Sequence, residues 1–222
     1  MKVGILDYGV GNIRSVFNAV RHVGFDPILV SNPAELENHS HIISPGVGSF
    51  GYVVQLFTEK GFKDAVNQYL LTGKYYLGIC VGMQMLFQGS DESPEAQGLG
   101  VMQGQVRKMV TSDGVTKSEG GQSDKRVKLP HIGWSKILLN SGNRDNSTCG
   151  LLDAVNSEDR FYFVHTYAAD PDLSDQLIAT TQYGENRIAS LVAHENTFGT
   201  QFHPERSGQA GLKLLSNFCH LG

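Results

Sequence analysis

The 222-residue chain has little of what marks secreted or nucleic-acid-binding proteins. It holds only three cysteines, Cys80, Cys149 and Cys219, which are widely spaced and odd in number. Such usage argues against a disulfide framework and fits a reducing compartment. The charges nearly balance, with 18 basic and 22 acidic residues. No basic excess therefore points to nucleic acid or to a membrane surface as a partner.

Long apolar runs are also missing. The longest run, around residues 75–87, contains Gln84 and is too short to span a bilayer. Asp7 interrupts the first apolar stretch, so no secretory signal pattern is visible. We therefore expect a cytoplasmic protein that does not enter a membrane, and an apolar fraction of 40% predicts a well-filled core.

The first half of the chain alternates between two hydrophobic patterns. Short apolar runs predict strands at residues 2–8, 26–30, 41–44 (ended by Pro45-Gly46) and 75–79, and helical spacing covers residues 13–23 and 50–71, the second with an early glycine interruption. Alternation of this kind predicts an α/β fold with a mostly parallel central sheet flanked by helices on both faces. In such sheets the binding and catalytic residues lie at the carboxyl ends of the strands.

The second half is richer in strands. Strands are expected at residues 101–110, 161–166, 177–181, 187–193 and 197–202, before an amphipathic helix at 210–219. Turns between successive strands predict antiparallel additions to the sheet. The polar segment 111–128 is expected to be an exposed loop or hairpin. The apolar runs on either side of it are too short for separate domains, so residues 1–222 are expected to form one domain.

One short pattern points to covalent chemistry. The sequence Gly78-Ile79-Cys80-Val81-Gly82 follows an apolar strand and precedes a helix-like run at residues 83–87. A sharp turn from strand to helix needs glycines on either side and exposes the central side chain beside backbone N–H groups, as in hydrolases that carry serine there. Cys80 is thus a candidate nucleophile. By itself, the pattern fits an inert, buried core cysteine about equally well.

A thiol nucleophile needs a base and an oxyanion site. His203 follows a predicted strand, and Glu205, two residues on, can orient its imidazole. The backbone N–H of Val81 and the glycine-rich loop Pro45-Gly46-Val47-Gly48 could stabilise an oxyanion. Taken singly, the His-Pro-Glu motif more often marks a surface turn, and the glycine loop an ordinary turn. Together with the cysteine pattern they favour a catalytic triad.

These segments resemble the class I, triad-type glutamine amidotransferases. The resemblance rests on Gly-Ile-Cys-Val-Gly-Met-Gln, on Pro-Gly-Val-Gly-Ser-Phe and on Gly-Thr-Gln-Phe-His-Pro-Glu. Three further segments, Asp-Tyr-Gly-Val-Gly-Asn-Ile at residue 7, Pro-His-Ile-Gly-Trp at 130 and Tyr-Phe-Val-His-Thr-Tyr at 162, are similar to the glutaminase subunits of imidazole glycerol phosphate synthases. The similarity runs from the first residue almost to the last and implies a flavodoxin-like fold.

The resemblance also implies roles for individual residues. Cys80 would attack glutamine, with His203 as base and then acid, and Glu205 orienting it. The other implied residues are Gly46, Val47, Gly48 and Val81 at the oxyanion, Gln84, His165, Thr166 and Tyr167 at the glutamine, and Asn12, Trp134 and Arg206 at a partner interface. In the family, a peptide flip at the Val47 position accompanies activation. The ammonia would pass to a (β/α)₈ cyclase subunit of a heterodimer, in histidine biosynthesis, and no cofactor or metal is expected.

Two departures from the family pattern leave an alternative open. Arg206 stands where lysine is more typical, and segment 111–128 is longer and more polar than expected. Paralogous glutaminase subunits that supply ammonia for bacterial surface-polysaccharide sugars would share the triad. More distant alternatives are a free-standing cysteine hydrolase and a non-catalytic module on the same fold, although the latter is expected to have lost a triad residue. Other amidotransferase subunits lack the segments at residues 7 and 130.

Overall fold

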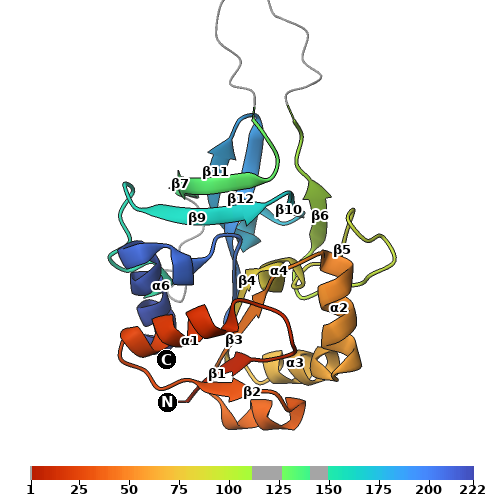
Figure 1. Ribbon diagram of the computed structural model, residues 1–222, viewed down its shortest axis with the longest axis vertical. Coiled ribbons are helices and arrows are strands. Elements are labelled where there is room, and N and C mark those ends of the chain that lie inside the picture. Colours follow the sequence, from red (N-terminus) through yellow and green to blue (C-terminus); the bar gives the residue numbers. More distant parts are fainter. Residues whose placement is uncertain (1, 112–126, 141–149) are drawn as a thin grey trace, which may run out of the picture.

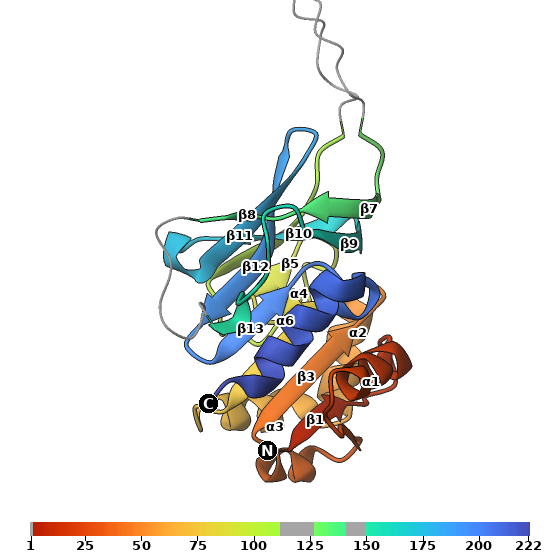
Figure 2. The same cartoon turned by 90° about the vertical axis from the view of Figure 1, so that its left-hand side faces the viewer.

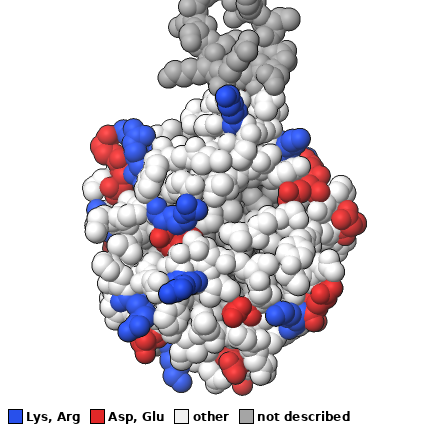
Figure 3. All heavy atoms as spheres, viewed as in Figure 1, with Lys and Arg blue, Asp and Glu red and all other residues white. Residues whose placement is uncertain are grey.

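The structure is a computed structural model that describes residues 2–111, 127–140 and 150–222. Most of the segment predicted to be an exposed loop, 111–128, lies outside the described residues, as does Cys149. Within the described part of the chain, no helix is long and apolar enough to cross a membrane. On the face seen in Figure 3, basic and acidic side chains are interspersed, with no continuous patch of either sign.

The helices and strands alternate along the first half, and strands dominate the second half. In chain order they are β1 (Val3–Leu6), α1 (Ile13–His22), β2 (Ile28–Val30), η1 (Pro33–Asn38), β3 (His41–Gly46), α2 (Phe50–Glu59), α3 (Phe62–Leu70), β4 (Tyr75–Cys80), α4 (Val81–Gln84), β5 (Gly89–Ser90), β6 (Gly104–Lys108), β7 (His131–Lys136), β8 (Leu138–Leu139), β9 (Arg160–His165), β10 (Tyr167–Pro171), η3 (Ser174–Gln176), β11 (Leu177–Tyr183), β12 (Asn186–His194), β13 (Thr197–Thr200), η4 (Pro204–Arg206) and α6 (Gly208–His220).

An eight-stranded sheet forms the centre of the molecule, in the order β2-β1-β3-β4-β13-β12-β11-β8. The pairs from β2 to β13 are parallel and those from β13 to β8 are antiparallel. Helices α1 and α6 cover one face of the parallel half and α2 and α3 the other (Figure 1). The predicted α/β fold is confirmed, including the antiparallel strands of the second half. The single-domain prediction for residues 1–222 is not tested by this architecture.

The strand-rich second half lies beyond the carboxyl ends of the parallel strands. Figures 1 and 2 show β7, β9 and β10 stacked above these ends, beside β11 and β12. The small sheets β10-β6-β5 and β7-β9 are separate from the central sheet. Because parallel sheets carry their chemistry at this edge, the second half forms the far wall of any site there.

The structure corrects three local predictions in the first half. Strand β3 continues through Pro45 and Gly46 rather than ending before them, and Gly46 pairs with Cys80. The helix expected over residues 50–71 is two helices separated at Gly61, whose φ of 75° suits glycine. The helix expected at 83–87 is the single turn Val81–Gln84, which lies closer to Cys80 than predicted.

Three strands of the second half, β7, β8 and β10, were not predicted. Strand β7 contains histidine, glycine, serine and lysine, and β10 ends in aspartate and proline, so neither has the apolar alternation typical of a strand. They form because β9 and β6 offer antiparallel partners. Tertiary pairing therefore overrides weak local preference here.

Close backbone contact at the turn after β4 requires glycine at position 82. A Cβ atom on Gly82 would overlap the carbonyl oxygen of Ser44. We expect Gly82→Ala to lower the free energy of unfolding by about 2–4 kcal/mol, because backbone on both sides would have to move. Urea unfolding followed by circular dichroism measures this change.

Gly24→Ala is the control for that experiment. Gly24 has a φ of 93° and open space around its Cβ position, so it reports the cost of the backbone conformation alone, about 1 kcal/mol. Equal losses in the two variants would show that the contact with Ser44 does not constrain the turn.

Candidate active site

Cys80 stands at the junction of β4 and α4, at the carboxyl edge of the parallel sheet. Its backbone adopts φ 57° and ψ −112°, a conformation that a non-glycine residue rarely takes. Backbone strain of this kind is found at functional sites, where the surrounding structure holds it. The side chain is 5% exposed, which does not by itself separate a nucleophile from a core cysteine. Its neighbours decide between these two interpretations.

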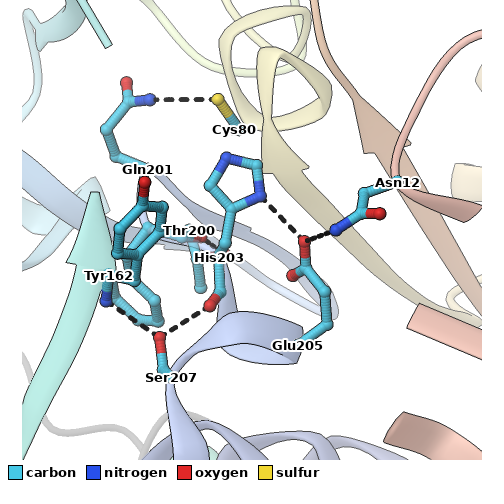
Figure 4. Close-up of polar contacts among 9 residues, drawn as sticks. Asn12, Cys80, Tyr162, Thr200, Gln201, His203, Glu205 and Ser207 are labelled. Atoms are coloured by element: carbon cyan, nitrogen blue, oxygen red, sulfur yellow. Dashed lines mark hydrogen bonds and ion pairs between the residues drawn. The ribbon is translucent and has the colours of Figure 1, made fainter. Parts of the chain in front are cut away.

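His203 and Glu205 come from the segment that follows β13, the next strand of the sheet. The His203 Nδ1 lies 2.8 Å from Glu205 Oε1, and both side chains are almost fully buried. The backbone of His203 is held at both ends, since its N–H donates to the Tyr162 carbonyl at 2.9 Å and its carbonyl accepts from Ser207 Oγ at 2.6 Å. The imidazole therefore has a fixed position, with the Nε2 atom directed toward Cys80 (Figure 4).

Cys80 and Glu205 make His203 strongly basic. Burial lowers the pKa of His203, but the contacts with Cys80 and Glu205 outweigh it and raise that pKa to about 10. The second carboxylate oxygen, Glu205 Oε2, has no hydrogen-bond partner among the described residues. A protonated His203 therefore compensates the buried carboxylate and carries a proton beside the thiol at neutral pH.

Asn12 was predicted at a partner interface, and the structure gives it a further contact. Its Nδ2 donates to Glu205 Oε1 at 3.2 Å, from the loop that precedes α1. The same carboxylate oxygen thus accepts from both Asn12 and His203 (Figure 4). The two residues are 193 positions apart in the sequence, so no local signal could reveal this contact.

The predicted oxyanion loop reaches Cys80 through the register of the sheet. Strands β3 and β4 pair in parallel with Gly46 opposite Cys80, so the residues after Gly46 pass beside the thiol. Val47 is 39% exposed and Gly48 has a φ of 114°, which favours glycine. Backbone N–H groups of this loop and of Val81 are therefore available near the position of the sulfur.

A pocket of about 750 Å³ opens above the thiol, which is room for an amino acid and water. It brings together most of the residues predicted to be at the site. Its lining includes Asn12, Val47, Gly48, Cys80, Val81, Gln84, His165, Thr166, Tyr167, His203 and Arg206. Of the predicted set, Gly46, Glu205 and Trp134 are not part of the lining. Glu205 lies behind His203, in the place expected for a residue that acts through the imidazole.

Glu92 was not predicted and also lines the pocket. It follows β5, and its Oε2 accepts the Phe50 N–H at the start of α2 at 2.7 Å. Glu92 stands in a polar loop with no motif around it, so no local pattern marks it as a site residue. It is the acidic side chain among the residues that line the pocket.

The amide of Gln84 is committed to the protein rather than to a ligand. Its Nε2 donates to the Tyr167 carbonyl at 3.0 Å and to Gln201 Oε1 at 3.0 Å. Both N–H bonds of that group are thus used. If Gln84 contacts glutamine as the resemblance implies, its side-chain oxygen is the remaining polar atom for that role.

Two buried histidines meet behind the pocket, from the paired strands β7 and β9. His131 Nδ1 lies 3.1 Å from His165 Nε2, and His165 Nδ1 lies 2.9 Å from the Tyr167 carbonyl oxygen. Burial lowers the pKa of His131 to about 4 and that of His165 to about 3. Both are therefore neutral at physiological pH.

This pair predicts a loss of stability in acid. The pKa of these histidines is 6.5 in the unfolded chain. Below that pH the unfolded chain binds protons that the buried histidines of the folded protein do not bind, so the free energy of unfolding decreases as the pH falls from 6.5 toward 4. We expect a loss of roughly 1–2 kcal/mol per histidine at pH 5. Urea unfolding at pH 7.5 and 5.0 measures it, and His131→Gln should reduce the loss. His194→Gln, at an exposed position, is the control that should not. An unchanged pH dependence in His131→Gln would contradict this prediction.

The other two residues predicted at an interface lie on the surface near the pocket. Trp134 is 51% exposed and is not part of the core. Its ring and that of Tyr162 lie 5.8 Å apart, and the Arg206 guanidinium lies 4.3 Å from the centre of the Tyr162 ring. The stacking uses the planar guanidinium, which a lysine at this position would not reproduce.

Metal ligands do not cluster in the described residues, where no group of three or more suitable side chains occurs. The two histidines of the His39-Ser40-His41 segment make structural contacts instead. His41 Nε2 binds the Leu221 carbonyl and His39 Nδ1 the Glu35 carbonyl. Cys219 is buried in α6, where desolvation raises its pKa to about 12, so that it is inert at neutral pH.

Comparison with known proteins agrees with this site. The family model for glutamine amidotransferase class-I matches residues 4–221. A subunit HisH of imidazole glycerol phosphate synthase from Pyrococcus furiosus is 38% identical, over 99% of both chains. The imidazole glycerol phosphate synthase hisHF of Schizosaccharomyces pombe is 39% identical over 98% of this chain, which spans only 38% of that protein's length.

Solved structures share the fold at low sequence identity. A glutamine amidotransferase crystal structure superposes with a TM-score of 0.68 at 20% identity, covering 99% of this chain and all of the other. A structure of PurLQS from Thermotoga maritima gives a TM-score of 0.70 at 19% identity, covering 98% and 97%. Together with the full-length match at 38% identity, these results show that the chain belongs to the class I glutamine amidotransferases, among the HisH subunits of imidazole glycerol phosphate synthase.

Proposed function

We propose that this chain hydrolyses glutamine to glutamate and ammonia and delivers the ammonia to a cyclase subunit in histidine biosynthesis. The observation that carries the proposal is the position of His203, between Glu205 at 2.8 Å and the Cys80 thiol at the base of the pocket. A cysteine with a charged imidazole beside it is the arrangement needed for acyl transfer from an amide.

The first step forms a covalent intermediate. The Cys80 thiolate attacks the carboxamide carbon of glutamine, and the carbonyl electrons move to oxygen, where N–H groups of Val81 and of the Gly46–Gly48 loop bind the oxyanion. When the C–N bond breaks, His203 gives its proton to the leaving nitrogen, so that ammonia departs and a glutamyl thioester remains. Glu205 stabilises the imidazolium throughout.

The second step regenerates the thiolate. Neutral His203 takes a proton from water, whose oxygen attacks the thioester carbon, and the C–S bond then breaks to release glutamate. The proton remains on His203 beside the thiolate, which restores the starting state. Every group that this cycle requires belongs to the chain, to glutamine or to water.

Glu92 is proposed to bind the α-ammonium of glutamine. It is the carboxylate among the pocket-lining residues, and a charged amine inside a pocket needs an anion. We expect Glu92→Gln to raise KM for glutamine about 10- to 100-fold while changing kcat only a few-fold, because the contact exists before and during the reaction. The side chain introduced by Glu92→Gln still has an oxygen that can accept the Phe50 N–H. Glu95→Gln, at an exposed position of the same loop, is the control, and a lower kcat at unchanged KM would refute the assignment.

A separate cyclase subunit is the proposed acceptor of the ammonia. The hisHF relative is much longer than this chain, which leaves room in it for a second catalytic unit. The exposed Trp134 and Arg206, together with the half-buried Tyr162 that both of them contact, give this chain an aromatic and cationic surface beside the pocket, as a docking site requires. A dry passage to the partner would keep ammonia unprotonated. Location in the cytoplasm is part of the same proposal.

The decisive experiment is release of glutamate from glutamine by the purified chain, alone and with a histidine-pathway cyclase subunit and its ribonucleotide ligand. We expect little release alone and strong stimulation by the partner with its ligand. No release in either case would favour the surface-polysaccharide paralogue, which would need another partner. Strong unstimulated release would favour a free-standing amidase.

A further inference from the structure

The thiol of Cys80 has a second polar neighbour besides His203. Gln201, two residues before His203, places its side-chain Nε2 at 3.7 Å from Cys80 Sγ, and it is fully buried. Figure 4 shows its amide pointing at the sulfur from beside the imidazole. An amide N–H donates but never gives up its proton at ordinary pH, so it stabilises the thiolate without competing for the acid–base role.

The orientation of this amide is fixed by its other end. Gln201 Oε1 accepts from Gln84 Nε2 at 3.0 Å, so the oxygen must face Gln84 and the nitrogen must face Cys80. The side-chain amide of Gln84 cannot rotate by 180°, because its second N–H donates to the Tyr167 carbonyl, which can only accept a hydrogen bond. The direction of each hydrogen bond is thus determined by a backbone group.

The Tyr167 carbonyl that accepts from Gln84 is also hydrogen-bonded to the histidine pair. It accepts from His165 Nδ1, so His165 Nε2 is unprotonated and accepts from His131 Nδ1. His131 Nε2 then accepts from the Ser135 hydroxyl at 3.1 Å, since both rings are neutral. One continuous chain of hydrogen bonds therefore runs from Ser135, next to the exposed Trp134, to the sulfur of Cys80.

We propose that Gln201 is a positioning residue that holds the Cys80 thiolate through a donated hydrogen bond, in an orientation set by Gln84 and the Tyr167 carbonyl. The inference rests on the proposed role of Cys80 as the nucleophile. It accounts for the burial of two glutamines and two histidines around the thiol, where buried polar groups are costly unless they are satisfied.

Other titratable groups also act on Cys80 and must be held constant. His203 faces the sulfur directly, and Tyr8, from the end of β1, interacts with it electrostatically. Glu205 acts on His203, and His203 acts in turn on His165. A substitution at Gln201 leaves all of these in place; Gln201→Met removes both the hydrogen bond donated to the sulfur and the acceptor of one Gln84 N–H, whereas Gln201→Glu keeps that acceptor.

The test measures the pH dependence of Cys80 alkylation by iodoacetamide, read by mass spectrometry of the Cys80 peptide in the full chain. It needs neither glutamine nor a partner. We expect Gln201→Met to move the midpoint upward by about one pH unit, the size expected for one hydrogen bond to a charged group. Gln201→Glu, which directs a carboxylate oxygen at the sulfur, should move it further. Gln182→Met, on the exposed face of β11, is the matched control and should not move it.

A measurement on the unmodified protein covers the case in which the variants do not fold. The side-chain amide proton of Gln201, observed by NMR, should shift with pH at the alkylation midpoint and lose that shift in Cys80→Ala. An amide signal that does not follow the Cys80 titration, or folded Gln201 variants with the original midpoint, would overturn the inference. A moved midpoint in a chain that releases no glutamate even with the cyclase subunit and its ligand would instead uphold Gln201 and refute the proposed function.

Discussion

Replacing Cys80 with serine is expected to reduce partner-stimulated glutamate release by about 10⁴-fold or more. The substitution changes one atom and keeps the strained turn, but a serine hydroxyl is not ionised beside His203 and attacks the carboxamide far more slowly. Loss of a nucleophile from a catalytic unit has effects of this size. Steady-state glutamate production measures the rate, and calorimetric titration with glutamine should show binding within a few-fold of the original.

Cys219→Ala is the control for this experiment, because Cys219 is buried in α6 away from the pocket. It should retain kcat within a few-fold. If Cys80→Ser kept about 1% or more of the stimulated rate, the thiol could not be the nucleophile, and the proposed reaction would have to be abandoned.

Glu205→Gln is expected to lower kcat by about 10²- to 10⁴-fold, the range seen when a buried carboxylate that orients a catalytic histidine is made neutral. The amide can still accept from Asn12 and His203, so the geometry should survive while the charge is lost. Glu205 is one of the groups that raise the pKa of His203 to about 10, and its removal lowers that pKa. The variant should therefore have less imidazolium at neutral pH.

The pH profile distinguishes this electrostatic role from simple structural damage. Imidazolium is lost as the pH rises through the pKa of His203, so activity should decline on the alkaline side of the profile. In Glu205→Gln this decline should occur at lower pH than in the original protein. Glu195→Gln, at an exposed turn between β12 and β13, is the control and should leave both kcat and the profile unchanged. An alkaline limb at the same pH in both proteins would argue against the assignment of Glu205.

The residues predicted from short motifs lie together in the structure because each motif comes at the end of a strand of the parallel sheet. Cys80, His203 and the Gly46–Gly48 loop each follow a predicted strand, and parallel strands present their carboxyl ends at one edge. Trp134 shows the limit of such reasoning, since its exposure became clear only from the packing of β7 on β9.

The sequence by itself determined the alternation of strands and helices, the glycine-bounded turn at Cys80 and the local pair of His203 and Glu205. All of these depend on residues close together in the chain, where periodicity and spacing carry information. Only the tertiary structure decided the contacts of Gln201 with Gln84 and Cys80, of Asn12 with Glu205, and the place of Glu92. Gln84 and Gln201 are 117 positions apart, and Asn12 and Glu205 are 193 apart. Such contacts follow from strand order and register, which are settled when the whole core packs, and no local pattern encodes them.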